Sequence, residues 1–154
     1  MRLDTRLSGV LHVLLHMAEQ EGPVTSDVLS RAMGTNPVVI RRILSGLRAQ
    51  SYVRSEKGHG GGWTLARDPA DITLRDIHAA LGNPALLAIG NRTSAPACLV
   101  EQAVNAALDG AFADAEARLL DALGKVTLAA LGADIHRGLA AKGHARKRTG
   151  THGH

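Results

Sequence analysis

The chain of 154 residues has few aromatic side chains, one cysteine and no long apolar run. Aromatics make up 2% of it (Tyr52, Trp63 and Phe112), which argues against a surface that stacks the bases of single-stranded nucleic acid. The single cysteine, Cys98, excludes an internal disulfide framework and fits a reducing compartment. Without a run of about 18 apolar residues or a secretory signal, the sequence predicts a cytoplasmic protein that does not bind membranes.

The residues that are present favour packed helices and a polyanionic partner. Hydrophobic residues make up 45% of the chain and are mainly Leu, Ile, Val and Ala, a composition typical of helical cores. Residues 1–67 carry nine Lys or Arg against five Asp or Glu, residues 68–140 carry five against nine, and residues 141–154 carry four against none. This asymmetry predicts that the first half of the chain meets the polyanion.

Residues 25–50 show the pattern of a helix-turn-helix, preceded by an amphipathic helix that Gly22 and Pro23 end. Thr25 or Ser26 can cap the first helix of the motif, and Gly34 can end it in a left-handed conformation. The expected inward residues of this helix are Val28, Leu29 and Ala32.

The second helix of the motif is basic on its free face. Asn36 followed by Pro37 is typical of an N-cap with proline at the first helical position. Helical spacing predicts inward residues Val39 or Ile40, Ile43, Leu44 and Leu47, and outward residues Val38, Arg41, Arg42, Ser45 and Arg48. A short turn between two helices, the second of them basic, is typical of DNA-binding proteins.

Residues 52–55 and 63–66 are short and β-prone, and they flank a glycine-rich loop. This pattern predicts a β-hairpin, of which residues 56–67 form the wing. The loop fails as a dinucleotide fingerprint because Trp63 stands where a third glycine is needed, and no Gly-Lys-Ser/Thr sequence makes it a P-loop. Its HGGG run, residues 59–62, matches an oxyanion-hole motif, but no G-x-S-x-G elbow accompanies it. A hydrolase is therefore a remote alternative to a DNA-contacting wing.

The remainder of the chain predicts a connector and long helices. A capping signature at residues 73–76 opens a helix that stops at Gly82. We expect a winged helix-turn-helix domain over 1–82, a connector over 83–97, dimerisation helices over 98–140 and a disordered basic tail over 141–154. Within the third region, one helix runs from Cys98 or Leu99 to about Leu123, and Thr127 caps another that ends near Leu139. The long helix is apolar on more of its surface than a wing domain can bury, which predicts a homodimer.

Four segments together resemble the Rrf-type winged helix-turn-helix regulators, the family of IscR, NsrR and CymR. They are MRL at the start, TNPVVIRRIL, KGHGGGWTLAR and ITLRDIHAALG. The similarity covers about residues 1–82 and continues more loosely through the long helix to VTLAAL at 126–131. It implies a mainly α fold with a small β-hairpin, and a dimeric bacterial transcription regulator, usually a repressor, with the long helices crossed at the dimer interface.

The resemblance places Asn36, Pro37, Val38 and Arg41 at the major-groove end of the recognition helix, and Gly60 to Gly62 on the wing. Charge and exposure add further candidates on both elements. The full candidate surface for double-stranded DNA is Thr35, Asn36, Pro37, Val38, Arg41, Arg42, Lys57, His59, Gly60, Gly61 and Gly62. No catalytic residue and no cofactor are predicted.

The segment around the connector differs from that of the relatives that bind an iron–sulfur cluster. Those relatives carry three cysteines in the connector, whereas this chain offers only Cys98. Cys98 is expected at a helix amino terminus, and the preferred interpretation is a small buried residue that packs at the dimer junction. The alternative is a reactive thiolate, which the helix dipole favours. A small-molecule effector between the wing domain and the long helices is a further alternative, with a pocket lined by Leu86, Leu87, Ile89 and Trp63. His12 and His16 have metal-ligand spacing but no third ligand nearby, so no metal site is predicted.

Overall fold

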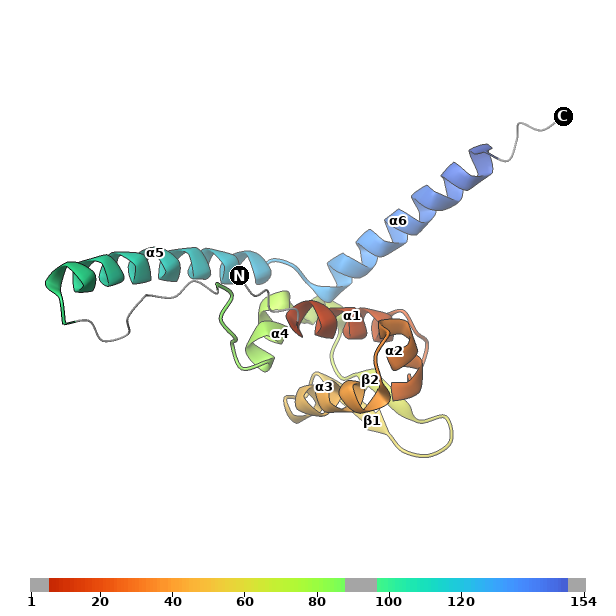
Figure 1. Ribbon diagram of the computed structural model, residues 1–154. Coiled ribbons are helices and arrows are strands. Elements are labelled where there is room, and N and C mark those ends of the chain that lie inside the picture. The colour runs from red at the N-terminus through yellow and green to blue at the C-terminus, as the bar shows by residue number, and fades with distance from the viewer. Residues whose placement is uncertain (1–5, 88–96, 150–154) are drawn as a thin grey trace.

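The computed structural model describes residues 6–87 and 97–149, and it has the expected mainly helical fold with one small β-hairpin (Figure 1). The elements in chain order are α1 (Arg6–Ala18), α2 (Ser26–Met33), α3 (Pro37–Ala49), β1 (Val53–Glu56), β2 (Gly62–Leu65), the short 3-10 helix η1 (Pro69–Asp71), α4 (Leu74–Ala80), α5 (Leu99–Leu123) and α6 (Leu128–Thr149). Among the described residues, no helix is both long and apolar enough to span a bilayer.

Side-chain caps fix the ends of the helix-turn-helix. The Oγ1 of Thr25 accepts from the backbone N–H of Val28 at 3.3 Å at the start of α2, and Gly34 ends α2 with φ of 63°. Asn36 Oδ1 then accepts from the N–H groups of Val38 and Val39 at 3.0 and 3.1 Å, with Pro37 at the first position of α3. These caps satisfy helix N–H groups that have no partner within their helix, so α3 begins at a defined residue.

The inward face of α3 is as expected, but that of α2 is not. Ile40, Leu44 and Leu47 are buried on α3. On α2, however, Val28 is 43% exposed and Ala32 is exposed, and the buried face consists of Ser26, Leu29 and Ser30. The prediction for Val28 and Ala32 was wrong because these two serines can face the core. Ser30 Oγ donates to the carbonyl of Asp27, and Ser26 Oγ accepts from Trp63, so neither hydroxyl is buried without a partner.

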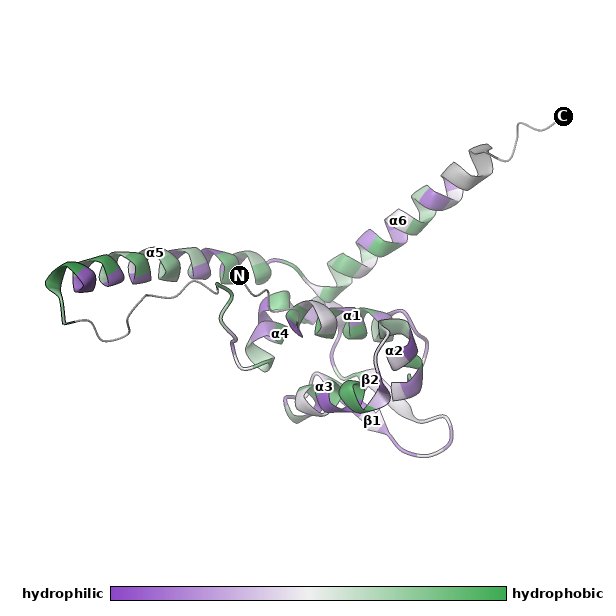
Figure 2. Cartoon of the chain, viewed as in Figure 1, coloured by the Kyte–Doolittle hydropathy of each residue, from purple (hydrophilic) through white to green (hydrophobic). Residues whose placement is uncertain are grey.

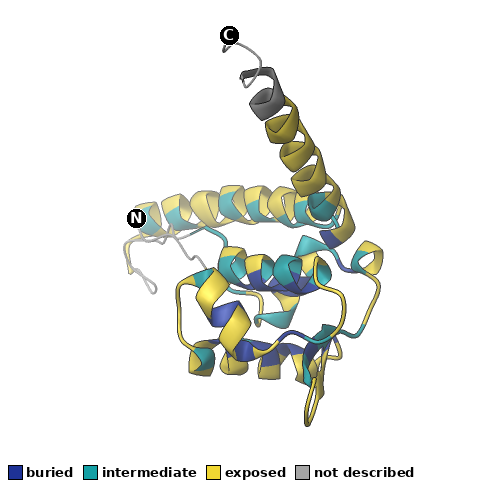
Figure 3. Cartoon of the chain, turned by 90° about the vertical axis from the view of Figure 1, so that its right-hand side faces the viewer, coloured by how far each residue is buried: buried dark blue, intermediate teal, exposed yellow. Residues whose placement is uncertain are grey.

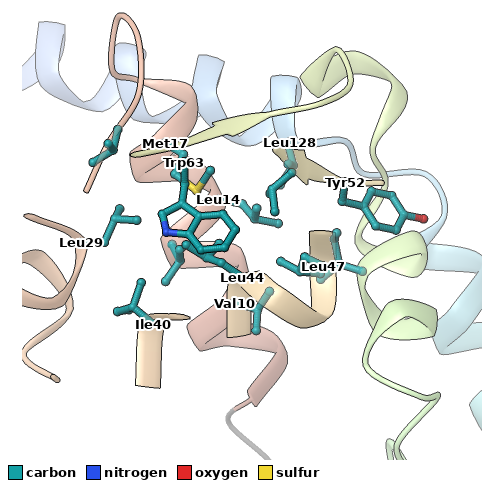
Figure 4. Close-up of a cluster of buried hydrophobic side chains, with 14 of the residues drawn as sticks. Val10, Leu14, Met17, Leu29, Ile40, Leu44, Leu47, Tyr52, Trp63 and Leu128 are labelled. Atoms are coloured by element: carbon teal, nitrogen blue, oxygen red, sulfur yellow. The ribbon is translucent and has the colours of Figure 1, made fainter. Parts of the chain in front are cut away.

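Trp63 joins the hairpin to the helices. Its indole lies among Leu14, Met17, Leu29 and Leu44 (Figure 4), and its Nε1–H donates to Ser26 Oγ at 3.1 Å. Its backbone also pairs with Val24, with N–H to carbonyl distances of 2.8 and 2.9 Å, so the chain just before α2 runs antiparallel to β2. Trp63 is therefore a core residue at 8% exposure. This corrects the expectation that it lines an effector pocket, while Ile89 lies outside the described residues.

The start of α6 is tied to the winged helix-turn-helix, which comprises residues 6–82. The N–H of Leu74 donates to the carbonyl of Val126 at 3.0 Å, and the N–H of Leu128 donates to that of Ile72 at 2.9 Å. The Leu128 side chain is 1% exposed and belongs to the same core as Trp63. From this anchored link α5 and α6 extend away from the compact part in different directions (Figure 1), and both are largely exposed (Figure 3).

Helix α6 is longer than expected. It was predicted to end near Leu139, with a disordered basic tail over 141–154, but it continues to Thr149. Residues 140–149 are mainly Ala, Lys and Arg, which are good helix formers, and cations near a helix carboxyl end interact favourably with its dipole. The tail prediction is therefore wrong for residues 141–149, and residues 150–154 lie outside the described part.

Candidate nucleic-acid interface

Helix α3 presents a polar, basic face to solvent because its opposite face is fully engaged in the core. Ile40 and Leu44 are each 0% exposed, whereas Arg41 and Arg42 are exposed and Val38 is 56% exposed. Within the described residues, no carboxylate pairs with either arginine. The helix therefore holds its outward side chains on a rigid base, with their positive charge uncompensated.

The amino end of α3 gathers the remaining helix candidates. Thr35 and Asn36 are exposed and Pro37 is half-buried. Because Asn36 Oδ1 is already occupied by two N–H groups of α3, this side chain has a structural role whatever else it contacts. Pro37 has no N–H, and Asn36 occupies the N–H groups of Val38 and Val39, so it is the helix dipole that favours an anion near this amino end.

The wing projects next to α3, at the end of the molecule opposite α6 (Figures 1 and 3). β1 and β2 pair antiparallel with Glu56 opposite Gly62, which leaves residues 57–61 as the connecting loop. Lys57, His59 and Gly60 are exposed on this loop. The fold thus brings two groups of candidates, far apart in sequence, to one side of the protein.

Gly61 and Gly62 are half-buried and have a structural reason to be glycine. A Cβ on Gly61 would lie 2.3 Å from the carbonyl oxygen of Glu56, and one on Gly62 would lie 2.7 Å from the carbonyl of Val24. Gly62 also has φ of +151°, a conformation that other residues rarely adopt. The sequence showed a flexible loop, but it did not show that Val24, in a distant segment, requires the glycine at 62.

Cys98 occupies the N-cap position of α5, as expected, and is exposed. The backbone N–H groups of Glu101 and Val100 lower the pKa of its thiol below the ordinary value, because they stabilise the thiolate. Val100, Val104 and Leu108, one turn apart along α5, line a shallow hollow beside it.

His12 and His16 lie on adjacent turns of α1, with their rings stacked and their Nε2 atoms 3.0 Å apart. Among the described residues, no group of three or more His, Cys, Asp or Glu is placed to hold a metal ion. The pair alone is thus not a metal centre of the usual kind.

The model of the Rrf2 family, described as an iron-dependent transcriptional regulator, matches residues 3–134 of the chain. The chain belongs to the Rrf2 family. This Rrf2 protein is therefore a DNA-binding transcriptional regulator and not an enzyme, so its HGGG loop is not the oxyanion hole of a hydrolase.

Individual relatives agree with this assignment. YwnA of Bacillus subtilis (strain 168) is 31% identical over 110 residues, which are 71% of this chain and 81% of YwnA. IscR of Xenorhabdus nematophila is 33% identical over 85 residues, 53% of this chain and 51% of that protein. The Rrf2 chain thus aligns with most of YwnA but with about half of that IscR.

Solved structures share the fold of this Rrf2 chain. IscR of T. potens superimposes with a TM-score of 0.67 at 21% identity, covering 88% of both chains. CymR of B. subtilis superimposes with a TM-score of 0.61 at 22% identity, covering 86% of this chain and 97% of CymR. At these identities the likeness establishes the winged-helix architecture and leaves the signal open.

The family description names iron, but the described residues of this Rrf2 chain do not fit an iron centre. The whole sequence holds one cysteine, whereas iron–sulfur clusters are held mainly by several thiolates. Among the described residues no set of three candidate ligands converges. No step of the function proposed below uses iron.

We predict that Gly62→Ala destabilises the fold, because the new methyl group overlaps the Val24 carbonyl and the backbone must leave its positive φ. We expect the free energy of unfolding to fall by about 1–3 kcal/mol, measured by urea denaturation. The matched control is Gly46→Ala on α3, where nothing lies within 4 Å of the new Cβ; alanine there should stabilise the helix by about 0.5–1 kcal/mol. Equal stability of the Gly62→Ala protein and the wild type would contradict the close approach.

Proposed function

We propose that this Rrf2 protein is a homodimeric repressor that inserts α3 into the major groove of operator DNA and places the wing on the adjacent backbone. The observation that carries the proposal is the two-faced character of α3. Its apolar side is buried in the core, and its outward side presents two arginines. Within the described residues, no carboxylate forms an ion pair with either of them. A rigid basic helix of this kind fits the width of the major groove.

The two arginines take different roles because consecutive helical positions point about 100° apart. Arg41 faces the base edges, where a guanidinium donates two hydrogen bonds to a guanine, and Arg42 reaches a phosphate. Thr35, Asn36 and Pro37 bring the amino end of α3 to the backbone, and Val38 offers an apolar contact to a thymine methyl group. On the wing, Lys57, His59 and the amide of Gly60 contact phosphates. Gly61 and Gly62 shape the loop that presents them, since the N–H of Gly61 donates to the carbonyl of Gly58 at 3.0 Å.

The homodimer is supported by the exposed apolar surface of the long helix. No residue of α5 is buried within one chain, and Leu99, Val100 and Val104 are 78%, 72% and 51% exposed. Green dominates α5 when the chain is coloured by hydropathy (Figure 2). A second copy packed against this helix removes the apolar surface from water and pairs two α3 helices on one duplex.

The signal that we propose is oxidation or electrophilic modification of Cys98. The thiol is exposed and its pKa is lowered, which raises the thiolate fraction at neutral pH. It also sits beside Val100 and Val104, in the surface assigned to the dimer. A bulkier or charged sulfur there disturbs helix packing between subunits and relieves repression.

A small-molecule effector is the second candidate, and one hollow favours it. This hollow is mainly apolar and is lined by α1 residues, among them Leu11 and His12, by Leu74 of α4 and by Leu123 of α5. It therefore lies between the winged helix-turn-helix and the long helix, at the place where a ligand would alter their relative position. Loss of DNA binding on adding a ligand to a Cys98→Ser protein would distinguish this signal from oxidation.

Arg41→Ala is expected to weaken operator binding by about 1–3 kcal/mol while leaving binding to unrelated duplex nearly unchanged, as a lost base contact should. Kd values are measured on genomic fragments selected by the purified protein and on a random duplex. Arg75→Ala, an exposed arginine of α4, is the control and should change neither. Equal losses on operator and random DNA would remove Arg41 from base recognition.

The wild-type protein should sediment at twice the chain mass of 16.1 kDa. Val104→Glu places a charge in the apolar surface of α5 and should shift the protein to monomer with loss of operator binding. Ala32→Glu adds the same charge on exposed α2 and should keep the dimer. A wild-type monomer at all protein concentrations would disprove the homodimer.

Hydrogen peroxide should lower the operator affinity of the wild type at least several-fold, and Cys98→Ser should abolish this response. Because the pKa of the thiol is lowered, its reaction rate with peroxide should reach half its maximum at a lower pH than for an ordinary cysteine. Electrophoretic mobility shifts and stopped-flow kinetics measure the two effects. If the Cys98→Ser protein responds like the wild type, the thiol is not the sensor.

A further inference from the structure

A second basic feature lies outside the candidate surface described above. Arg48, Arg54 and Arg67 line one hollow between the carboxyl end of α3 and the base of the hairpin, together with Ser51 and Ser55. The hollow contains no acidic side chain among its lining residues. Three guanidinium groups that line one hollow repel one another, and a bound anion offsets this repulsion.

Arg67 is held in place by neutral groups. Its Nε donates to the carbonyl of Ser51 and its Nη2 to that of Gln50, each at 3.2 Å, and its guanidinium lies 4.2 Å from the centre of the Tyr52 ring. These contacts fix the side chain without cancelling its charge. A fixed guanidinium loses little conformational entropy on binding a phosphate.

Arg48 connects the hollow to the recognition helix. Its Nη1 donates to Ser55 Oγ at 3.1 Å, and its guanidinium lies 5.7 Å from the centre of the Trp63 ring. It follows Arg41 by two helical turns and therefore lies on the same stripe of α3. Seven residues correspond to about 10 Å along the helix, roughly three base-pair steps of B-DNA.

Arg54 completes the group from β1, where it is exposed and pairs in register with Thr64. Within the described residues no carboxylate forms an ion pair with Arg48, Arg54 or Arg67. The three charges therefore remain available to a partner that approaches from the side of α3.

We propose that this hollow binds a phosphate of the DNA backbone, about three base pairs from the bases that Arg41 contacts. The inference rests on the proposed DNA binding by α3 and adds a contact beyond those of the amino half of α3 and the wing tip. A DNA phosphate is favoured over a free anion because the hollow continues the outward stripe of α3. The contact is independent of base sequence and sets the register of the helix in the groove.

The test uses Arg54→Gln and Arg48→Gln in the full chain, with Kd measured on operator and random duplex between 50 and 200 mM salt. Each variant should weaken both duplexes by a similar factor and reduce the slope of log K against log salt by about one. Arg54→Lys should restore most of the slope because it restores the charge. Arg75→Gln, the control on α4, should leave the slope unchanged.

The outcomes separate the two proposals. If the wild type binds no duplex, the proposed function fails. If the wild type binds and both glutamine variants keep the wild-type slope and the wild-type urea midpoint, the phosphate contact is wrong. A separate experiment adds inorganic phosphate or pyrophosphate to the wild-type protein and follows the fluorescence of Trp63, with chloride as the control. Saturable binding in this experiment without a slope change in the variants overturns the assignment to DNA and makes the hollow a free-anion site.

Discussion

The packing of Trp63 is the constraint on which the DNA-binding geometry depends. This residue belongs to the hairpin, pairs through its backbone with Val24, donates to Ser26 of α2 and lies against α1 and α3. It is the only tryptophan in the chain, and it connects the wing to the helix-turn-helix. Trp63 is therefore a central link between α3 and the wing, together with the hydrogen bonds from Arg48 to Ser55 and from Arg67 to Gln50 and Ser51.

The same packing explains why the wing needs glycine where it does. Val24 approaches β2 so closely that a side chain at Gly62 would overlap its carbonyl, and the loop turns back on Glu56 at Gly61. Beyond these two positions the loop is free to expose Lys57 and His59. One short segment thus combines a base fixed by backbone contacts with a tip that is open to a partner.

The sequence predicted most of the fold because its strongest signals are local. These signals act within a few residues, and the structure confirms them. They are the N-caps at Asn36 and Thr73, the glycine that ends α2 at position 34, and the helical spacing of apolar residues on α3. One error depends on a partner that is distant in sequence, the Trp63 side chain that donates to Ser26. Val28 and Ala32 were assigned inward because hydropathy was weighed without the hydrogen bonds that allow serines into the core.

The candidate site was predictable on α3 and less so elsewhere. The outward positions of Arg41 and Arg42 follow from helical spacing alone. The grouping of Arg48, Arg54 and Arg67 does not, because it requires the end of α3 and both sides of the hairpin to meet. The end of α6 differs for a local reason, because the basic composition of residues 141–149 predicts a disordered tail while its Ala, Lys and Arg residues are also good helix formers.

The anchoring of Leu128 has a mechanical consequence. Residues 124–128 attach the carboxyl end of α5 and the start of α6 to the core. The 25 residues of α5 therefore extend about 37 Å from the winged helix-turn-helix, to which the helix is attached at its carboxyl end. Cys98 lies at the opposite, amino end of α5. In the proposed homodimer, a modification at Cys98 would therefore act through the whole length of α5 on the spacing of the two α3 helices.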